Sequence, residues 1–334
     1  MVTYHQEKGV LDHMKAIELR AFGEPLVLTD RPSPVIGEGQ ELIDVTACGV
    51  CHSDIHVVDG TWGSPLPLIL GHEVTGVHKQ LGPVMVYAPW GCRQCWLCDE
   101  GHEMMCPDGA EAGLFKDGGY AEQMRVTHRE YLHPLGDLDP VHSAPLACGG
   151  LTAFRAVKHT LDVVRRKGAK SRVLVIGAGG LGQFGIQFFR LRTDAEIWVL
   201  DPANGKQQRA LELGADRAVS ADDLDGKFDA IIDFVGAPET VPLTVERVQR
   251  RGIVVVCGLY GGRVPFGIGA VPHEAHFMSS IWGSIPEMGE LIAFAQEHPL
   301  QYTVEAMALE DAQLAHQRLR AGDVAGRIAL VPTR

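Results

Sequence analysis

The stretch SRVLVIGAGGLG, residues 171–182, decides the fold of the second half of the chain. It begins as a short β-branched apolar run, which predicts a buried strand, and continues as G-x-G-x-x-G at Gly177, Gly179 and Gly182. A second apolar run, EIWVLD, ends at Asp201 and predicts the next strand. A strand, a glycine loop that opens a helix, and an acidic residue about 20 positions on together predict a dinucleotide-binding fold.

Each residue type in this loop serves phosphate or ribose binding. Gly177 allows a tight turn, Gly179 lets backbone N–H groups approach a pyrophosphate, and Gly182 lets the helix pack close to the strand. The helix N-terminus adds partial positive charge for the phosphates. A carboxylate at Asp201 accepts hydrogen bonds from both ribose hydroxyls and repels a 2′-phosphate, which favours NAD over NADP. The alternative is a structural glycine turn in which Asp201 caps the following helix.

Outward from the loop, strands and helices alternate. The strands are expected at 171–177, 196–201, 229–235 and 252–257, and the helices at 180–192, 205–213 and 239–250. This alternation predicts a parallel sheet covered on both faces. Further helices at 286–297 and 310–321 and a closing strand at 327–331 are expected.

Before residue 150 the pattern changes. Short apolar runs cut by Gly and Pro occupy residues 14–22, 41–50, 73–80, 84–89 and 120–126. Such runs predict a β-rich domain. The predicted fold class is therefore α/β, with a β-rich domain beside a doubly wound parallel sheet.

Composition limits the functional classes. The chain has 334 residues, which at about 150 per domain predicts two domains. Its net charge of −12 disfavours binding to nucleic acid or to an acidic membrane surface. Residues 1–13 lack the apolar core of a signal peptide and read as an N-terminal extension. A cytoplasmic protein with reduced thiols is expected.

Four of the eight cysteines, Cys92, Cys95, Cys98 and Cys106, lie in one short loop. Four thiolates at this spacing suit a tetrahedral zinc ion with no open position, so a structural zinc site is predicted. An iron–sulfur cluster is the alternative. However, the ferredoxin pattern places three residues before its last cysteine, whereas this loop has seven.

A second, dispersed group comprises Cys51, His72 and Cys148. Together they would form a zinc site with two cysteines, one histidine and an open fourth position, which catalysis requires. Each residue alone is weak evidence, because a buried cysteine is often a small apolar residue. Cys48 and Cys257 are expected to be such core residues.

Several motifs in order resemble the zinc-dependent medium-chain alcohol dehydrogenase family. They are GVCHSD (49–54), GHE (71–73), the four-cysteine loop (92–106), GGYAE (118–122), PLACGGLT (145–152), GAGGLG (177–182) and AGRIAL (325–330). The resemblance implies a GroES-like catalytic domain at 14–150 and 297–334, interrupted by a Rossmann domain at 151–296. It also implies two zinc ions per chain, NAD, a homodimer or homotetramer, and hydride transfer between an alcohol and NAD to give an aldehyde or ketone.

The resemblance assigns catalytic roles by position. Cys51, His72 and Cys148 match the catalytic zinc ligands. Ser53 matches the hydroxyl that takes the alcohol proton, and His56 matches the end of the proton relay to solvent. Asp54 matches the carboxylate that orients the histidine ligand. Glu73 matches the acid that can approach the metal.

The resemblance also assigns cofactor contacts. Thr152 and Leu181 match residues that flank the nicotinamide, Lys206 the ribose partner, and His52 and Arg327 the pyrophosphate contacts. The full expected set of cofactor-binding residues is His52, Thr152, Gly177, Gly179, Gly180, Leu181, Gly182, Asp201, Lys206, Gly258, Leu259 and Arg327.

By family position, Trp62, Ala88 and Trp282 would line the substrate pocket. Two indoles beside a small residue favour an aromatic or medium-chain alcohol or ketone, unless a tryptophan packs elsewhere. Other zinc dehydrogenases, of the polyol or aldehyde type, are alternatives, although Cys148 stands where the polyol enzymes typically carry an acid. A non-catalytic NAD-binding homologue is a further alternative.

One segment, 77–86, is shorter than in the family pattern. Leu81-Gly82-Pro83 could close a tight hairpin there. Because the zinc ligands on both sides are present, catalysis is expected to survive the shortening.

Overall fold

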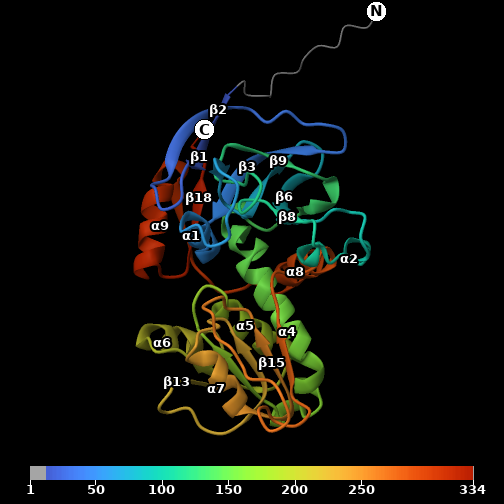
Figure 1. Ribbon diagram of the computed structural model, residues 1–334, viewed down its shortest axis with the longest axis vertical. Coiled ribbons are helices and arrows are strands. Elements are labelled where there is room, and N and C mark those ends of the chain that lie inside the picture. The colour runs from blue at the N-terminus through green and yellow to red at the C-terminus, as the bar shows by residue number, and fades with distance from the viewer. Residues whose placement is uncertain (1–12, 334) are drawn as a thin grey trace, which may run out of the picture. The chain divides into compact units, whose positions relative to one another are not determined.

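The computed structural model describes residues 13–333, which form two compact units (Figure 1). The first unit contains 13–92, 107–147 and 304–333, and the second contains 93–106 and 148–303. The chain thus leaves the first unit twice and returns to it. Apart from His13, the predicted extension 1–13 lies outside the described residues, and the domain boundaries predicted from the sequence stay predictions.

The first unit is β-rich, as its short apolar runs predicted. In the described chain its main sheet has the order β10-β6-β5-β3-β18-β17, with β9 also paired to β3. These strands are β3 (Glu41–Gly49), β5 (Glu73–His78), β6 (Gly82–Val86), β9 (Gln123–Val126), β10 (Leu132–Pro134), β17 (Val304–Ala308) and β18 (Arg327–Val331). The last part of the chain therefore pairs with an early strand, since β18 lies beside β3.

Smaller elements complete the first unit. One sheet has the order β2-β1-β4, and β7 pairs with β8. Their bounds are β1 (His13–Leu19), β2 (Val27–Pro32), β4 (Leu68–Ile69), β7 (Pro89–Trp90) and β8 (Ala110–Glu111). The helices are α1 (His52–Val58), α3 (Pro140–Ser143) and α9 (Ala312–Ala321), and α1 lies in contact with α9.

The shortened segment forms a tight hairpin, as predicted, but its turn is at 79–81 rather than at Leu81-Gly82-Pro83, because Gly82 and Pro83 already belong to β6. Strands β5 and β6 pair antiparallel from Thr75 with Met85 to His78 with Gly82. The turn at its end is fastened by the Leu81 N–H, which donates to His78 Nδ1 at 3.2 Å. The segment 77–86 is therefore accommodated inside one hairpin.

The second unit contains a parallel sheet with the order β13-β12-β11-β14-β15-β16. This is the strand order of a dinucleotide-binding fold. The strands are β11 (Arg172–Ile176), β12 (Glu196–Leu200), β13 (Arg217–Val219), β14 (Phe228–Asp233), β15 (Val248–Val256) and β16 (His276–Ser279). The helices are α2 (Trp96–Asp99), α4 (Gly149–Arg165), α5 (Gly182–Arg192), α6 (Asn204–Glu212), α7 (Thr240–Arg247) and α8 (Ile285–Glu297).

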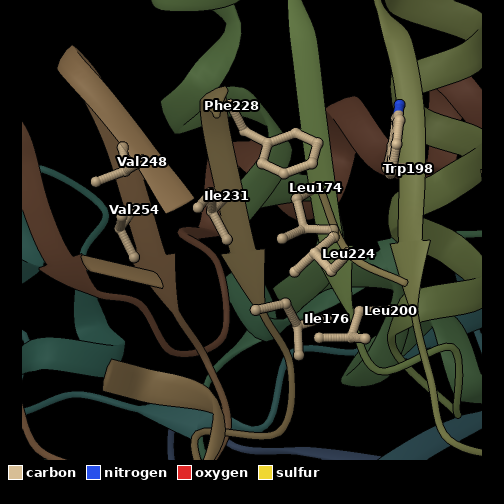
Figure 2. Close-up of a cluster of buried hydrophobic side chains, with 9 residues drawn as sticks. All are labelled: Leu174, Ile176, Trp198, Leu200, Leu224, Phe228, Ile231, Val248 and Val254. Atoms are coloured by element: carbon tan, nitrogen blue, oxygen red, sulfur yellow. The ribbon is translucent and has the colours of Figure 1, made fainter. Parts of the chain in front are cut away.

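Both faces of this sheet are covered. Figure 2 shows one buried cluster, against which Leu243 of α7 packs. The cluster consists of Leu174, Ile176, Trp198, Leu200, Leu224, Phe228, Ile231, Val248 and Val254. All six residues of β14 are buried, as expected for a central strand covered on both sides.

Some elements differ from the sequence-based expectation. Helix α4, strand β13 and strand β16 were not predicted. Helix α7 ends at Arg247 rather than at residue 250, because the following residues already belong to β15. Among the described residues, no helix is long and apolar enough to cross a membrane.

Candidate metal centres and active site

The four-cysteine loop brings its thiols to one point. The sulfur atoms of Cys92, Cys95, Cys98 and Cys106 all lie within 4.8 Å of one another. Cys95 Sγ is 3.6 Å from Cys98 Sγ and 3.8 Å from Cys106 Sγ. A zinc–sulfur bond of about 2.3 Å places tetrahedral ligands about 3.8 Å apart, whereas a disulfide bond is about 2.0 Å long. The spacing fits one tetrahedral ion.

The protonation of this loop also fits a metal site. Burial raises the pKa of the Cys98 thiol to about 12, although a backbone hydrogen bond from Arg93 lowers it. A thiolate is therefore unfavourable there unless a cation offsets its charge. Zinc supplies that charge and displaces the proton.

The second group of candidate ligands comes from three separate segments. Cys51 is the N-cap of α1, His72 follows Gly71 just before β5, and Cys148 is the N-cap of α4. One ligand atom of each, together with a carboxylate oxygen of Glu73, lies within 4.8 Å of the others. All four side chains are buried. The two thiolates and the imidazole make the donor set of a zinc site with one position left for another ligand.

The Asp54 carboxylate joins helix α1 to the histidine ligand. Its Oδ2 accepts a hydrogen bond from the Cys51 N–H at 2.9 Å, and its Oδ1 lies 3.1 Å from His72 Nδ1. Burial alone would lower the pKa of His72, but the Asp54 carboxylate and Cys51 hold it well above its ordinary value. With Nδ1 directed at Asp54, Nε2 is the nitrogen that can bind a metal.

Glu73 forms a buried ion pair that the sequence reasoning missed. Its two carboxylate oxygens lie 2.5 and 2.6 Å from Arg327 Nη2, which also donates to the Val50 carbonyl at 3.4 Å. Burial raises the pKa of Glu73 to about 7, although the Arg327 charge opposes that rise. Arg327 was expected to contact a pyrophosphate, and that role stays a prediction.

Two residues without a predicted role complete the Asp54 surroundings. The Tyr120 hydroxyl donates to Asp54 Oδ2 at 3.0 Å and lies 3.2 Å from His316 Nε2. Tyr120 stands inside the GGYAE motif, so its position carried a signal. His316 lies on α9, far along the chain, and its only signal was its place beside buried alanines on one helix face.

The expected proton-relay residues lie on α1. Ser53 and His56 are partly buried, and the His56 and Trp62 rings are 5.5 Å apart between centroids. His52, the first residue of the helix, is exposed. Their roles in proton transfer and cofactor binding stay predictions.

The glycine loop of the second unit has the geometry expected for close phosphate approach. Gly177 has φ +86°, which side chains rarely adopt. A Cβ at Gly182 would lie 1.8 Å from the Gly177 carbonyl oxygen, so only glycine fits the helix so close to the strand. Among the described residues other than its chain neighbours, no atom lies within 4 Å of a Cβ built on Gly179, which leaves its surface open.

Asp201 connects this loop to the following turn. Its Oδ2 accepts from the Ala178 N–H and its Oδ1 from the Ala203 N–H, both at 2.9 Å. The second bond fastens the turn before α6, but Asp201 does not cap that helix as the alternative interpretation expected, because its N-cap is Ala203 and has no side-chain cap hydrogen bond. A carboxylate oxygen can accept more than one hydrogen bond, so these contacts do not prevent ribose binding.

The other expected contacts are distributed over both units. Thr152 is buried in the first turn of α4, and its N–H donates to the Cys148 carbonyl. Leu181 is the N-cap of α5, whereas Lys206 and Leu259 are exposed. The remaining positions are partly buried Gly180 and Gly258, partly buried Trp62, and buried Ala88 and Trp282.

Both cysteines expected to be core residues lie outside the two metal groups. Cys48 is fully buried in β3, and Cys257 is partly buried just after β15. Burial raises the pKa of both thiols. None of the eight cysteines, all within the described residues, forms a disulfide bond.

Comparisons with known proteins agree with this geometry. The family model of the alcohol dehydrogenase GroES-like domain matches residues 37–137, and that of the zinc-binding dehydrogenases matches 180–297. An NAD-dependent alcohol dehydrogenase of Sulfurisphaera tokodaii is 32% identical over 352 residues, covering 96% of this chain and 100% of that protein. A D-arabinose 1-dehydrogenase (NADP(+)) of Saccharolobus solfataricus is 30% identical, covering 95% of this chain and 97% of that protein.

A solved structure is similar over the same length. The alcohol dehydrogenase of Aeropyrum pernix has a TM-score of 0.86 and 31% identity, and the match covers 95% of this chain and 100% of that one. The chain belongs to the zinc-dependent medium-chain alcohol dehydrogenase family. This confirms the predicted family and the predicted fold class, a GroES-like domain with a Rossmann domain. The chain is thus a zinc-binding dehydrogenase.

Proposed function

We propose that this dehydrogenase transfers a hydride between a primary or secondary alcohol and NAD, giving an aldehyde or ketone. One observation carries the proposal: Cys51, His72 and Cys148 converge within 4.8 Å in a buried site. Two thiolates and one imidazole are the ligands of catalytic zinc sites that keep a fourth position for substrate. A separate four-cysteine site would hold a structural zinc ion, which leaves this second group for catalysis. The similarity to NAD-dependent alcohol dehydrogenases over nearly the whole chain supports the same reaction.

The chain's residues have distinct tasks in this reaction. A zinc ion on Cys51, His72 and Cys148 would supply positive charge that lowers the pKa of an alcohol, and NAD would supply the hydride acceptor. Burial of the ligands keeps bulk water from that charge and so strengthens its effect. Ser53 accepts the alcohol proton, and His56 passes it to solvent.

The preference for NAD rests on Asp201. Its carboxylate is 4% exposed at the end of β12 and would repel a 2′-phosphate. Since a related D-arabinose dehydrogenase is named for NADP(+), this preference is a property to measure. Steady-state kinetics with NAD and with NADP should give a lower KM for NAD. Asp201→Ser should reduce the difference between the two KM values.

The substrate class follows from Trp62, Ala88 and Trp282. Two indoles beside a small residue favour an aromatic or medium-chain alcohol. The similarity to a sugar dehydrogenase makes a polyhydroxy substrate the second candidate. Indole walls offer few hydrogen bonds to such a substrate, so it is expected to be used less well.

A panel of primary, secondary and aromatic alcohols and of pentoses tests the function. NADH formation is measured for each, before and after zinc removal with a chelator. Turnover that disappears on chelation and returns with added zinc is expected. No turnover with any alcohol or sugar, by a protein that still binds zinc and NAD, would instead support a non-catalytic homologue.

The cell compartment and assembly are part of the proposal. A cytoplasmic location is supported by eight cysteines of the described chain that form no disulfide bond, because disulfides are rare in a reducing compartment. A homodimer or homotetramer is supported by exposed apolar side chains on one loop of the second unit, namely Leu259, Tyr260, Phe266 and Ile268. Light scattering on the purified protein would measure the assembly.

A further inference from the structure

A chain of four buried polar side chains runs from the histidine ligand to the C-terminal helix of the first unit. His72 Nδ1 lies 3.1 Å from Asp54, the Tyr120 hydroxyl 3.0 Å from the same carboxylate, and His316 Nε2 3.2 Å from that hydroxyl. His316 is 5% exposed and the other three side chains are fully buried. The proposed reaction uses His72 and Asp54 but leaves Tyr120 and His316 without a task.

The protons in this chain have only one consistent arrangement. A carboxylate only accepts, so the Tyr120 hydroxyl donates to Asp54 Oδ2, while His72 Nδ1 faces Oδ1 at 3.1 Å. The Tyr120 hydroxyl has one proton, which it donates to Asp54. Its contact with His316 must therefore be a hydrogen bond donated by His316 Nε2. Burial lowers the pKa of His316, and Arg320 lowers it further although Asp54 opposes this, so the ring stays neutral.

Tyr120 is itself held against the segment that leads into His72. Its N–H donates to the Leu70 carbonyl at 3.0 Å, and its carbonyl accepts from the Ile17 N–H at 2.8 Å. A Cβ at Gly71 would lie 2.3 Å from Tyr120 Cδ1, so the ring packs directly on the backbone before the ligand. This packing is independent of the hydrogen bonds and points to the same place.

We propose that Tyr120 and His316 are positioning residues for the zinc ligand His72. The Tyr120 hydroxyl and the Cys51 N–H both bind Asp54 Oδ2, which turns Oδ1 toward His72. His316 in turn fixes the direction of the hydroxyl. The inference rests on the proposed role of His72 as a ligand of the catalytic zinc.

An alternative role of Tyr120, acting on the charge of Asp54, predicts the opposite change in zinc affinity. A hydrogen bond withdraws negative charge from Asp54, so removing it would make the carboxylate a stronger acceptor and His72 a stronger ligand. If the hydroxyl instead positions Asp54, its removal leaves only the Cys51 N–H on Oδ2. The carboxylate can then rotate, because the terminal torsion of an aspartate is soft. The positioning role therefore predicts weaker zinc binding without the hydroxyl, and the electronic role predicts tighter binding.

Tyr120→Phe tests this, because it removes the hydroxyl and keeps the ring against Gly71. Zinc affinity of the catalytic site is measured by chelator competition on the full-length enzyme, and cobalt is substituted there to read the visible spectrum. We expect about tenfold weaker zinc binding and a shifted cobalt spectrum. A tenfold loss is at the lower end of the range seen when residues that hold metal ligands are replaced. Unchanged or tighter binding would overturn the inference.

Tyr131→Phe is the matched control. Tyr131 is 1% exposed in the same unit, and its hydroxyl accepts from the Gly91 N–H rather than from Asp54. This variant loses an equally buried hydroxyl but should leave the zinc affinity of the catalytic site and the cobalt spectrum as in the wild type. A similar change in both variants would indicate general destabilisation.

A double-mutant cycle tests the part played by His316. His316→Leu should weaken zinc binding by a few-fold in the wild type and by nothing further in Tyr120→Phe, since it acts through that hydroxyl. His316→Gln keeps an N–H donor and should restore most of the affinity. Additive effects, or no recovery with Gln, would remove His316 from the chain.

These outcomes separate the inference from the proposed function. If the wild-type enzyme binds only one zinc per chain, the catalytic site itself is wrong. If it binds two and the Tyr120 and His316 variants match it in affinity and spectrum, only the positioning role is wrong.

Discussion

The two zinc sites of this enzyme differ in how the chain builds them. The four-cysteine site takes all its ligands from one loop, 92–106, and its thiols mainly contact one another. The catalytic site takes Cys51, His72 and Cys148 from three segments, and Asp54 holds the histidine from outside. A closed site with four protein ligands is shaped by its ion, whereas an open site needs its ligands held by the fold.

The comparison predicts that the two sites fail in different ways. Cys51→Ser should abolish turnover, because the charge that the ion places on the substrate contributes several kcal/mol, or about a thousandfold or more in rate. Zinc content should fall from two ions to one per chain, and NADH binding, read by fluorescence, should persist. His72→Ala should behave alike. Near-normal turnover by either variant would contradict the assignment of the catalytic site.

The corresponding change in the loop should affect stability. Cys98→Ser replaces a thiolate by a hydroxyl that binds zinc poorly, so the loop loses its ion and the unfolding free energy falls by about 3 kcal/mol. For a chain of this size, Tm should fall by roughly 4 °C while kcat measured well below Tm changes less than about threefold. Calorimetry and kinetics on the same sample check this. A loss of kcat at unchanged Tm would show that the four-cysteine loop acts in catalysis rather than in stability.

Much of this contrast could be predicted from the sequence. The loop was found from spacing alone, because its ligands are close along the chain and cysteine has few other uses at that density. The glycine loop was found for the same reason, and its turn and close packing at Gly177 and Gly182 are as predicted. The dispersed ligands needed the resemblance to a family, since spacing cannot bring residues 51, 72 and 148 together.

What remained hidden depends on contacts made only in the folded chain. His316 meets Tyr120 across almost two hundred residues, and no local pattern marks such a pair. The Glu73–Arg327 pair was missed likewise, since Arg327 was read only as a phosphate contact. Helix α4 was missed although its buried Leu151, Phe154 and Leu161 lie on one face.

Protons and zinc should compete for the thiols of the four-cysteine loop. Burial raises the pKa of Cys98 to about 12 in the folded protein, so at neutral pH the metal-free thiol is protonated. Zinc binding must release that proton, and lowering the pH therefore weakens binding. Chelator competition between about pH 6 and pH 8 should show affinity falling at least tenfold per unit of acidification. A pH-independent affinity would mean that the thiols are already ionised without metal.

The smallest expected effect distinguishes a neighbour of the catalytic metal from a ligand. Glu73 is close enough to bind the ion, but both its oxygens contact Arg327. Glu73→Gln keeps an acceptor for Arg327 and removes its countercharge, so the unfolding free energy should fall by about 2 kcal/mol because a buried charge loses its partner. Zinc affinity should change less than about threefold, since two cysteines and one histidine still hold the ion.

Urea unfolding and chelator competition measure the two quantities separately. A tenfold or larger loss of zinc affinity in Glu73→Gln would make Glu73 a fourth protein ligand. The site would then be closed like the four-cysteine loop, and an alcohol could bind the metal only after Glu73 had moved away. A stability loss with zinc affinity retained instead assigns Glu73 to holding Arg327 at the start of β18. In that case the fourth position stays open for substrate.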